Sequence, residues 1–154
     1  MKTRTILLTV ATLFAVVAVC FAADVNTGTW KLNEAKSKVS AGAPKNTMVV
    51  IAAAGDSMKV TVDGVGADGK PAHNEWAGKF DGKDYPITGD PAADMRAYKP
   101  VNEHTMALTE KKGGKITNTG RVVVSTDGKT RTVTVSRTDA NGKKMSTTFV
   151  YDKQ

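Results

Sequence analysis

A histidine and a glutamate lie two positions apart in the middle of the chain, at His73 and Glu75. Alternate residues of a β-strand point to the same side, so the imidazole and the carboxylate would be neighbours on one face. Such a pair can act as a general base or bind a metal. A metal site needs a further ligand, and no motif connects the pair with the other histidine, His104. We therefore expect a solvated surface pair, with a hydrolase or isomerase using His73 and Glu75 as the alternative.

The sequence contains none of the motifs that mark the common enzyme sites. It has no nucleophile elbow, no HExxH motif and no glycine-rich phosphate loop. The spacing of Asp63 and Asp68 does not fit an EF-hand calcium loop. We therefore expect a protein that is not an enzyme and that has no catalytic residue, no metal and no other cofactor.

A second group of residues is suited to holding an apolar or amphipathic molecule. Trp76 and Phe80 share one face of a predicted strand with Asn74, and they would line a pocket if that face is internal. The hydroxyl of a tyrosine such as Tyr98 could bind a polar group, and a methionine such as Met106 adapts to irregular shapes. Ordinary core packing is the alternative for each of these side chains.

These residues lie on short stretches that alternate with the period of a β-strand. In residues 57–62, Met58, Val60 and Val62 share one face, while Lys59 and Thr61 share the other. The only helix candidate, residues 34–39, has no long apolar stripe. The sequence predicts ten strands, at residues 27–33, 46–52, 57–62, 71–80, 85–87, 95–99, 104–110, 115–125, 130–137 and 143–151.

Glycine-containing turns separate the predicted strands: Asp68-Gly69, Asp81-Gly82, Asp127-Gly128, Asn141-Gly142 and Gly113-Gly114. Such pairs favour two-residue type I′ hairpin turns. Consecutive hairpins make an up-and-down meander, and closing a long meander removes the edge strands that invite aggregation. We therefore predict an all-β fold, a single antiparallel β-barrel or β-clam of about ten strands with at most one short helix.

The N-terminus has the features of an export signal. Two basic residues precede an apolar run, and small residues follow it. We predict a signal peptide at residues 1–22 and one domain at residues 23–154, secreted or periplasmic after cleavage. The run is barely long enough to span a bilayer, so an uncleaved anchor is one alternative. A lipoprotein attached through Cys20 is another, although Val19 is bulkier than the residue expected there.

Composition limits the partners. The chain has 154 residues and a net charge of +7, and its single cysteine excludes an internal disulfide. Lysines gather at predicted hairpin tips, as at Lys111, Lys112 and Lys115, with no aromatic residue beside them for base stacking. We expect solvated lysines that oppose aggregation, no nucleic-acid binding and a monomer, with an anionic membrane surface as an alternative partner.

The segment Gly28-Thr29-Trp30-Lys31-Leu32 resembles the opening strand of the calycins, which include the lipocalins and the intracellular fatty-acid-binding proteins. The final strand, residues 147–153, is similar to the closing strand of the fatty-acid-binding type. Only these terminal motifs carry the resemblance by residue. The resemblance implies that Trp30 plugs one end of a barrel whose lumen binds a small molecule.

The chain departs from that family in two ways. Residues 34–45 are too few for the two helices that fatty-acid-binding proteins place between their first strands. Those proteins also bind a carboxylate with an arginine and a tyrosine two positions apart on the last strand. Tyr151 matches the tyrosine, but Phe149 stands in place of the arginine. A bound carboxylate would need another cation, for which the candidates are Arg121, Arg131 and Arg137.

We therefore expect a secreted or periplasmic protein that binds a small apolar or amphipathic ligand without catalysis. The residues expected to line the lumen are Trp76, Phe80, Tyr98, Met106, Arg121, Arg131, Phe149 and Tyr151, with Trp30 as the plug. The alternative is an envelope-associated structural or protein-interaction module whose barrel is filled by its own side chains. A lumen smaller than roughly 300 Å³ would favour that alternative.

Overall fold

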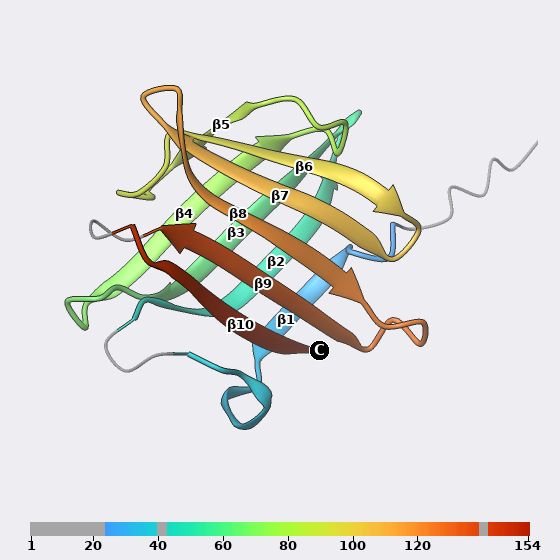
Figure 1. Cartoon of the computed structure of the whole chain (residues 1–154). Coiled ribbons are helices and arrows are strands. Elements are labelled where there is room, and N and C mark those ends of the chain that lie inside the picture. The colour runs from blue at the N-terminus through green and yellow to red at the C-terminus, as the bar shows by residue number, and fades with distance from the viewer. Residues whose placement is uncertain (1–23, 40–42, 139–141) are drawn as a thin grey trace, which may run out of the picture.

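A computed structural model of the chain describes residues 24–39, 43–138 and 142–154 (Figure 1). The predicted signal peptide, Cys20 and Asn141 lie outside these residues, so the predictions that concern them stay predictions. Within the described ranges, ten antiparallel strands form a closed barrel, accompanied by one short 3₁₀ helix. The all-β prediction is confirmed. No helix in these ranges is long and apolar enough to cross a membrane.

The strands follow one another around the barrel in the order of the sequence, and β1 closes the ring between β2 and β10. Trp30 on β1 lies opposite Val49 on one side and Lys153 on the other. This closure leaves no free sheet edge in the described fold. The elements are β1 (Gly28–Leu32), η1 (Glu34–Lys36), β2 (Lys45–Ala54), β3 (Ser57–Val65), β4 (Pro71–Gly78), β5 (Tyr85–Thr88), β6 (Met95–Asn102), β7 (Thr105–Lys112), β8 (Lys115–Val124), β9 (Thr130–Thr138) and β10 (Lys144–Lys153).

The turns correct one prediction. No described residue other than glycine has a positive φ, so the turns at Asp68, Asp81 and Asp127 are not type I′. Each aspartate carboxylate instead accepts a hydrogen bond from the backbone N–H two residues later, at 3.0 to 3.1 Å. At Gly113-Gly114 both residues have positive φ, 56° and 78°, as a type I′ turn requires.

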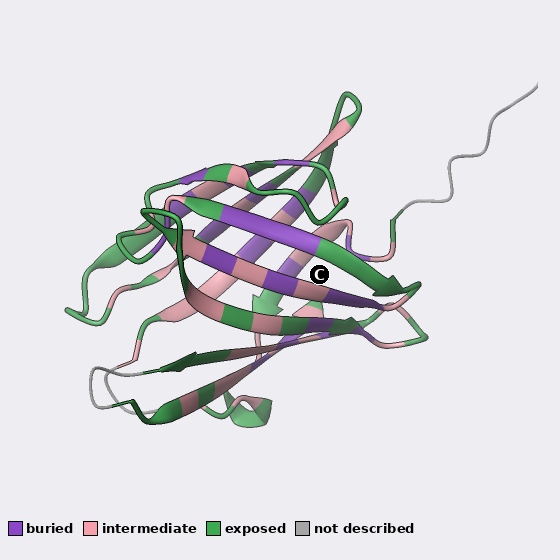
Figure 2. Cartoon of the chain, turned by 45° about the horizontal axis from the view of Figure 1, so that its top comes forward, coloured by how far each residue is buried: buried purple, intermediate pink, exposed green. Residues whose placement is uncertain are grey.

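Buried and more exposed residues alternate along the strands, as Figure 2 shows by colour. This is the pattern of side chains that point by turns into the barrel and towards the solvent. On β3, Val60 and Val62 are buried, whereas Lys59 and Asp63 are exposed. The interior differs along the barrel axis. Side chains pack it tightly at the end that holds Trp30, which we call the closed end, and they leave a cavity towards the other end, which we call the open end.

The closed end comprises the turns that join β2 to β3, β6 to β7 and β8 to β9, and aromatic rings fill its interior. Trp30 is fully buried, and its Nε1–H donates to the carbonyl of Asn26 at 2.8 Å. Trp76 stacks on Phe80, with 5.9 Å between ring centroids, and meets Tyr98 edge-to-face at 5.0 Å. These contacts bury large apolar areas in favourable ring geometries, so this part of the barrel is a core and not a lumen.

Candidate functional site

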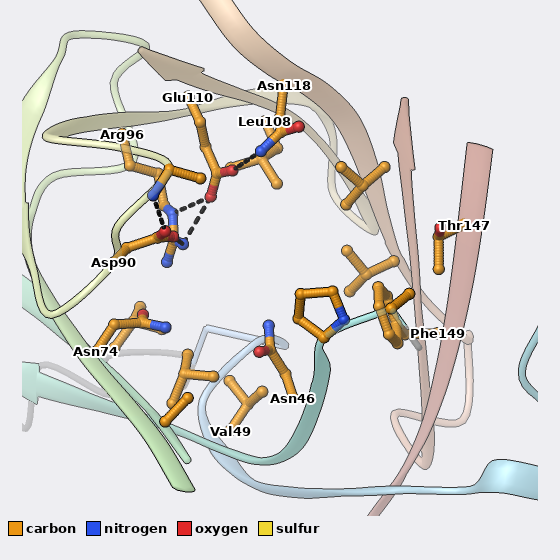
Figure 3. A pocket seen from close by; sticks show the side chains of 18 of the residues that line it. Asn46, Val49, Asn74, Asp90, Arg96, Leu108, Glu110, Asn118, Thr147 and Phe149 are labelled. Carbon is orange, nitrogen blue, oxygen red and sulfur yellow. Dashed lines mark hydrogen bonds and ion pairs between the residues drawn. The ribbon is translucent and has the colours of Figure 1, made fainter. Parts of the chain in front are cut away.

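A cavity of about 330 Å³ occupies the barrel towards the open end (Figure 3). It extends to the β3–β4 hairpin, the loop between β5 and β6, and the ends of β8 and β9. Most of its wall is apolar and comes from inward positions of eight strands, β2 to β4 and β6 to β10. The apolar lining includes Val49, Val60, Val62, Leu108, Val122, Val133, Val135 and Phe149.

One wall of the cavity carries a buried ion pair. Arg96 on β6 donates to Glu110 on β7, with Nε 2.7 Å and Nη2 2.6 Å from Oε1. Asn118 on β8 donates through Nδ2 to the other carboxylate oxygen at 2.7 Å. Asp90, from the loop before β6, lies 3.6 Å from Arg96 Nη2. Figure 3 shows these four side chains gathered on one side of the cavity.

Strand register explains why this network forms. Arg96 lies directly opposite Glu110, which in turn lies opposite Asn118, so one row across three strands brings the groups together. Burial disfavours the charge of Arg96, but Tyr98, Glu110 and Asp90 outweigh that effect and raise the pKa of its guanidinium. The Arg96 charge is therefore compensated inside the protein.

A second buried arginine lies deeper, beside the closed end, and differs in its surroundings. Arg131 on β9 is 3% exposed, and its Nε has no hydrogen-bond partner among the described residues. No described carboxylate forms an ion pair with it. Tyr151 lies directly opposite on β10, with its ring centroid 5.9 Å from the guanidinium carbon, and a side-chain hydrogen bond joins the guanidinium to Tyr98. This geometry suits a cation–π contact but leaves the positive charge without an anion.

Burial is the main cause of the pKa shifts of Arg131 and Tyr151. Burial lowers the pKa of the Arg131 guanidinium; nearby Tyr98 and Tyr151 oppose the effect, and Arg96 adds to it. Burial also raises the pKa of the Tyr151 hydroxyl, against the influence of Arg131. Arginine nevertheless stays protonated in proteins. At neutral pH the cavity floor therefore presents a cation together with a neutral phenol.

The structure separates the predicted lumen residues into three groups. Tyr98, Arg131, Phe149 and Tyr151 line the cavity. Trp76, Phe80 and Met106 do not line it; they pack in or against the core beneath it. Arg121 is exposed on the outside of β8, between inward positions, so the expectation that it faces the lumen is wrong. Trp30 is also in the core, away from the cavity wall. Arg137, the remaining cation candidate, lines the open end of the cavity.

His73 and Glu75 point outward from β4, because Asn74 between them points inward. His73 Nδ1 is 2.7 Å from Asp63 Oδ1, and Glu75 is paired with Lys59 at 2.8 Å. The hydrogen bond to Asp63 is the main cause of the raised pKa of His73. Neither His73 nor Glu75 lines the cavity, so a reaction in the lumen could not use them.

Sequence reasoning missed the polar wall, namely Arg96, Glu110, Asn118 and Asp90. A usable signal existed for the strand residues. Arg96 is two positions from Tyr98, and an even number of residues along a strand returns to the same face. In the described ranges, no group of three or more His, Cys, Asp or Glu side chains is placed to hold a metal.

No protein-family model matches the chain, and no curated protein matches it significantly in sequence. Among solved structures, the chain is similar to one described as "Structure of EF1p2_mFAP2b bound to DFHBI". The TM-score is 0.50 and the sequence identity 12%, over 86% of this chain and 97% of that one. Likeness at this identity concerns the fold alone. It agrees with an antiparallel β-barrel.

Proposed function

We propose that this protein binds a small amphipathic molecule in the barrel lumen, with an anionic group of the ligand beside Arg131. The observation that carries the proposal is a buried guanidinium without a described carboxylate partner, at the floor of a cavity with largely apolar walls. The similar barrel of known structure is described as bound to DFHBI, which supports small-molecule binding by this architecture.

The apolar part of the ligand would contact the valine-rich wall. The cavity, at about 330 Å³, lies at the lower end of the size range of ligand pockets. This volume disfavours the alternative of a structural module with a filled barrel, although it restricts the ligand to a small molecule. Apolar groups that enter such a site gain from leaving water, by about 25 cal/mol per Å² of buried area.

The anionic group would compensate the charge that the protein leaves unpaired. A buried cation without an anion is unfavourable, whereas charge-assisted hydrogen bonds from a guanidinium to a carboxylate are among the strongest in proteins. The neutral hydroxyl of Tyr151 can donate to the same group. Arg96 is not available in this way, because Glu110 already occupies it at 2.6 Å.

The remaining parts of the proposal come from the sequence. We propose that the barrel is exported after removal of residues 1–22, and that it acts by binding and not by catalysis. The outward position of His73 supports the second point, since the only acid–base pair suggested by sequence lies away from the cavity.

A cavity-blocking variant tests whether binding occurs in the lumen. Val135 lines the cavity opposite Gly120 and Thr147, so Val135→Trp would fill space near its open end. The matched control is Val123→Trp, at a valine that is 37% exposed on the outer face. The probe is 1-anilinonaphthalene-8-sulfonate, an anionic aromatic dye that fluoresces in apolar sites.

We expect the wild-type protein and Val123→Trp to bind the dye alike, and Val135→Trp to bind it at least about tenfold more weakly, a difference of about 1.4 kcal/mol. Far-ultraviolet circular dichroism would establish that both variants fold. Equal binding by the two folded variants, or no binding by the wild-type protein, would overturn lumen binding.

A further inference from the structure

The two ends of the barrel differ in how their charged side chains are compensated. At the closed end, Lys79 pairs with Asp56 at 2.7 Å, and Lys83 lies 3.9 Å from Asp81. This end also has two exposed lysines without an ion pair among the described residues, Lys99 and Lys129, and two exposed carboxylates, Glu103 and Asp127, that offset them. The open end carries exposed cations for which no ion pair exists among the described residues: Lys112, Lys115, Arg137 and Lys144. Among the described residues of the open end, Asp94 is the only carboxylate without an ion pair. It accepts a hydrogen bond from the N–H of Gly113 at 2.8 Å.

Exposed apolar side chains accompany the cations of the β7–β8 hairpin. Ile116 is 61% exposed and Met95 is 38% exposed. Register places them together on the outer face, because Met95 lies opposite Lys111, and Lys111 lies opposite Ile116. The Lys111 ammonium pairs with Asp84 at 2.6 Å, so it adds no unpaired charge. The aliphatic part of the Lys111 side chain lies between the two apolar side chains. We call Met95, Lys112, Lys115 and Ile116 the mouth patch.

The mouth patch lies beside the entrance of the cavity. The inner faces of the same two strands contribute Glu110 and Asn118 to the cavity wall, while their outer faces and tips contribute the patch. Figure 1 shows the β7–β8 hairpin at the end of the barrel opposite the turns before β7 and after β8. A surface that contacts the mouth patch would therefore lie next to the cavity opening.

We propose that the mouth patch docks the open end of the barrel on an anionic lipid membrane. Lysines held near an anionic bilayer are attracted to its surface charge, and an exposed isoleucine can enter the boundary between headgroups and acyl chains. The charge contrast orients the protein, because exposed carboxylates offset the unpaired lysines of the closed end, whereas unpaired cations outnumber carboxylates at the open end. The docking goes beyond lumen binding and needs no ligand, yet it would present the cavity to amphipathic molecules in the bilayer.

Co-sedimentation with vesicles tests this proposal. The protein is the chain from residue 24, which contains every strand of the barrel and omits the apolar N-terminal run that would itself bind lipid. Vesicles of phosphatidylcholine are compared with vesicles that also contain phosphatidylglycerol, each at low and high salt. We expect binding to the anionic vesicles only, and we expect salt to weaken it.

Two variants and a matched control locate the contact. Lys112→Glu with Lys115→Glu should weaken binding to anionic vesicles at least about thirtyfold, since each lysine is replaced by a repelled charge. Ile116→Ser should weaken it about threefold to tenfold, because part of the side chain no longer leaves water. The control, Lys99→Glu with Lys129→Glu, makes the same charge change at exposed positions near the closed end, and we expect it to change binding little.

The outcomes test membrane docking independently of ligand binding in the lumen. An equal loss of binding in the control would mean attraction by net charge alone and would overturn docking through the mouth patch. Absence of binding to anionic vesicles at low salt would overturn it as well. Val135→Trp, which fills the cavity, should bind vesicles like the wild-type protein, so failure of lumen binding and failure of docking give different results.

Discussion

Two buried arginines share the cavity, but only one of them is compensated. Arg96 on the wall has Glu110 at 2.6 Å and Asp90 at 3.6 Å, and Asn118 secures the far oxygen of Glu110. Arg131 on the floor has the ring of Tyr151 near it and no described carboxylate. Both side chains are almost fully buried, so burial alone does not explain the difference.

The contrast between the two arginines indicates which of them supports the fold and which is placed to bind a ligand. A buried ion pair with satisfied hydrogen bonds holds strands in register, and breaking it from one side is costly. A buried cation left unpaired has a cost in the free protein that a ligand can relieve. We therefore interpret the Arg96 region as part of the scaffold and the Arg131 region as the recognition site.

The largest expected effect comes from breaking the compensated pair. Glu110→Gln leaves Arg96 with only the more distant carboxylate of Asp90, and we expect a loss of about 3 kcal/mol in the free energy of unfolding. Urea denaturation measures the change. Glu75→Gln is the matched control, because Glu75 forms an exposed pair with Lys59. The scaffold role would be contradicted if the two variants lost similar, small amounts of stability.

A smaller effect on stability is expected at the exposed pair of Asp63 and His73, on the outer face of the barrel. The hydrogen bond to Asp63 raises the pKa of folded His73 above its usual value near 6.5. Its contribution to stability is therefore complete below the unfolded pKa and is lost as the pH rises through the folded pKa.

Asp63→Asn should return the pKa of His73 towards the usual value, as read from the NMR titration of its ring protons. The melting temperature of the variant should be slightly below that of the wild-type protein at about pH 5 to 6, and the difference should disappear as the pH rises through the folded pKa of His73. An unchanged His73 titration would mean that Asp63 does not hold the imidazole in solution.

Much of the fold could be predicted from sequence because local signals specify it. Alternation and glycine turns placed ten strands close to their observed positions. The turn type was less predictable: Asp68, Asp81 and Asp127 use their carboxylates to accept a backbone hydrogen bond, so the glycine alone takes a positive φ.

The site was less predictable, since strand alternation gives a face but not a depth along the barrel. Trp76 does point inward, yet it lies below the cavity and not on its wall. Arg121 precedes three consecutive valines. Because all three are apolar, the sequence does not show the alternation that turns Arg121 outward. The Arg96–Glu110–Asn118 row depends on the register of the strands. Bulges near Pro100 and Glu110 shift that register, and the sequence does not reveal it.

The most direct test of the central claim compares octanoate with octanol, which differ in the anionic group, on the wild-type protein and on Arg131→Met. Isothermal titration should show that the wild-type protein prefers octanoate by at least about tenfold, because a guanidinium–carboxylate hydrogen bond contributes about 1.5–3 kcal/mol. Arg131→Met should fold with unchanged or higher stability and lose the preference. A wild-type protein that binds both compounds equally, or a variant that keeps the preference for octanoate, would contradict the claim that Arg131 recognises the ligand.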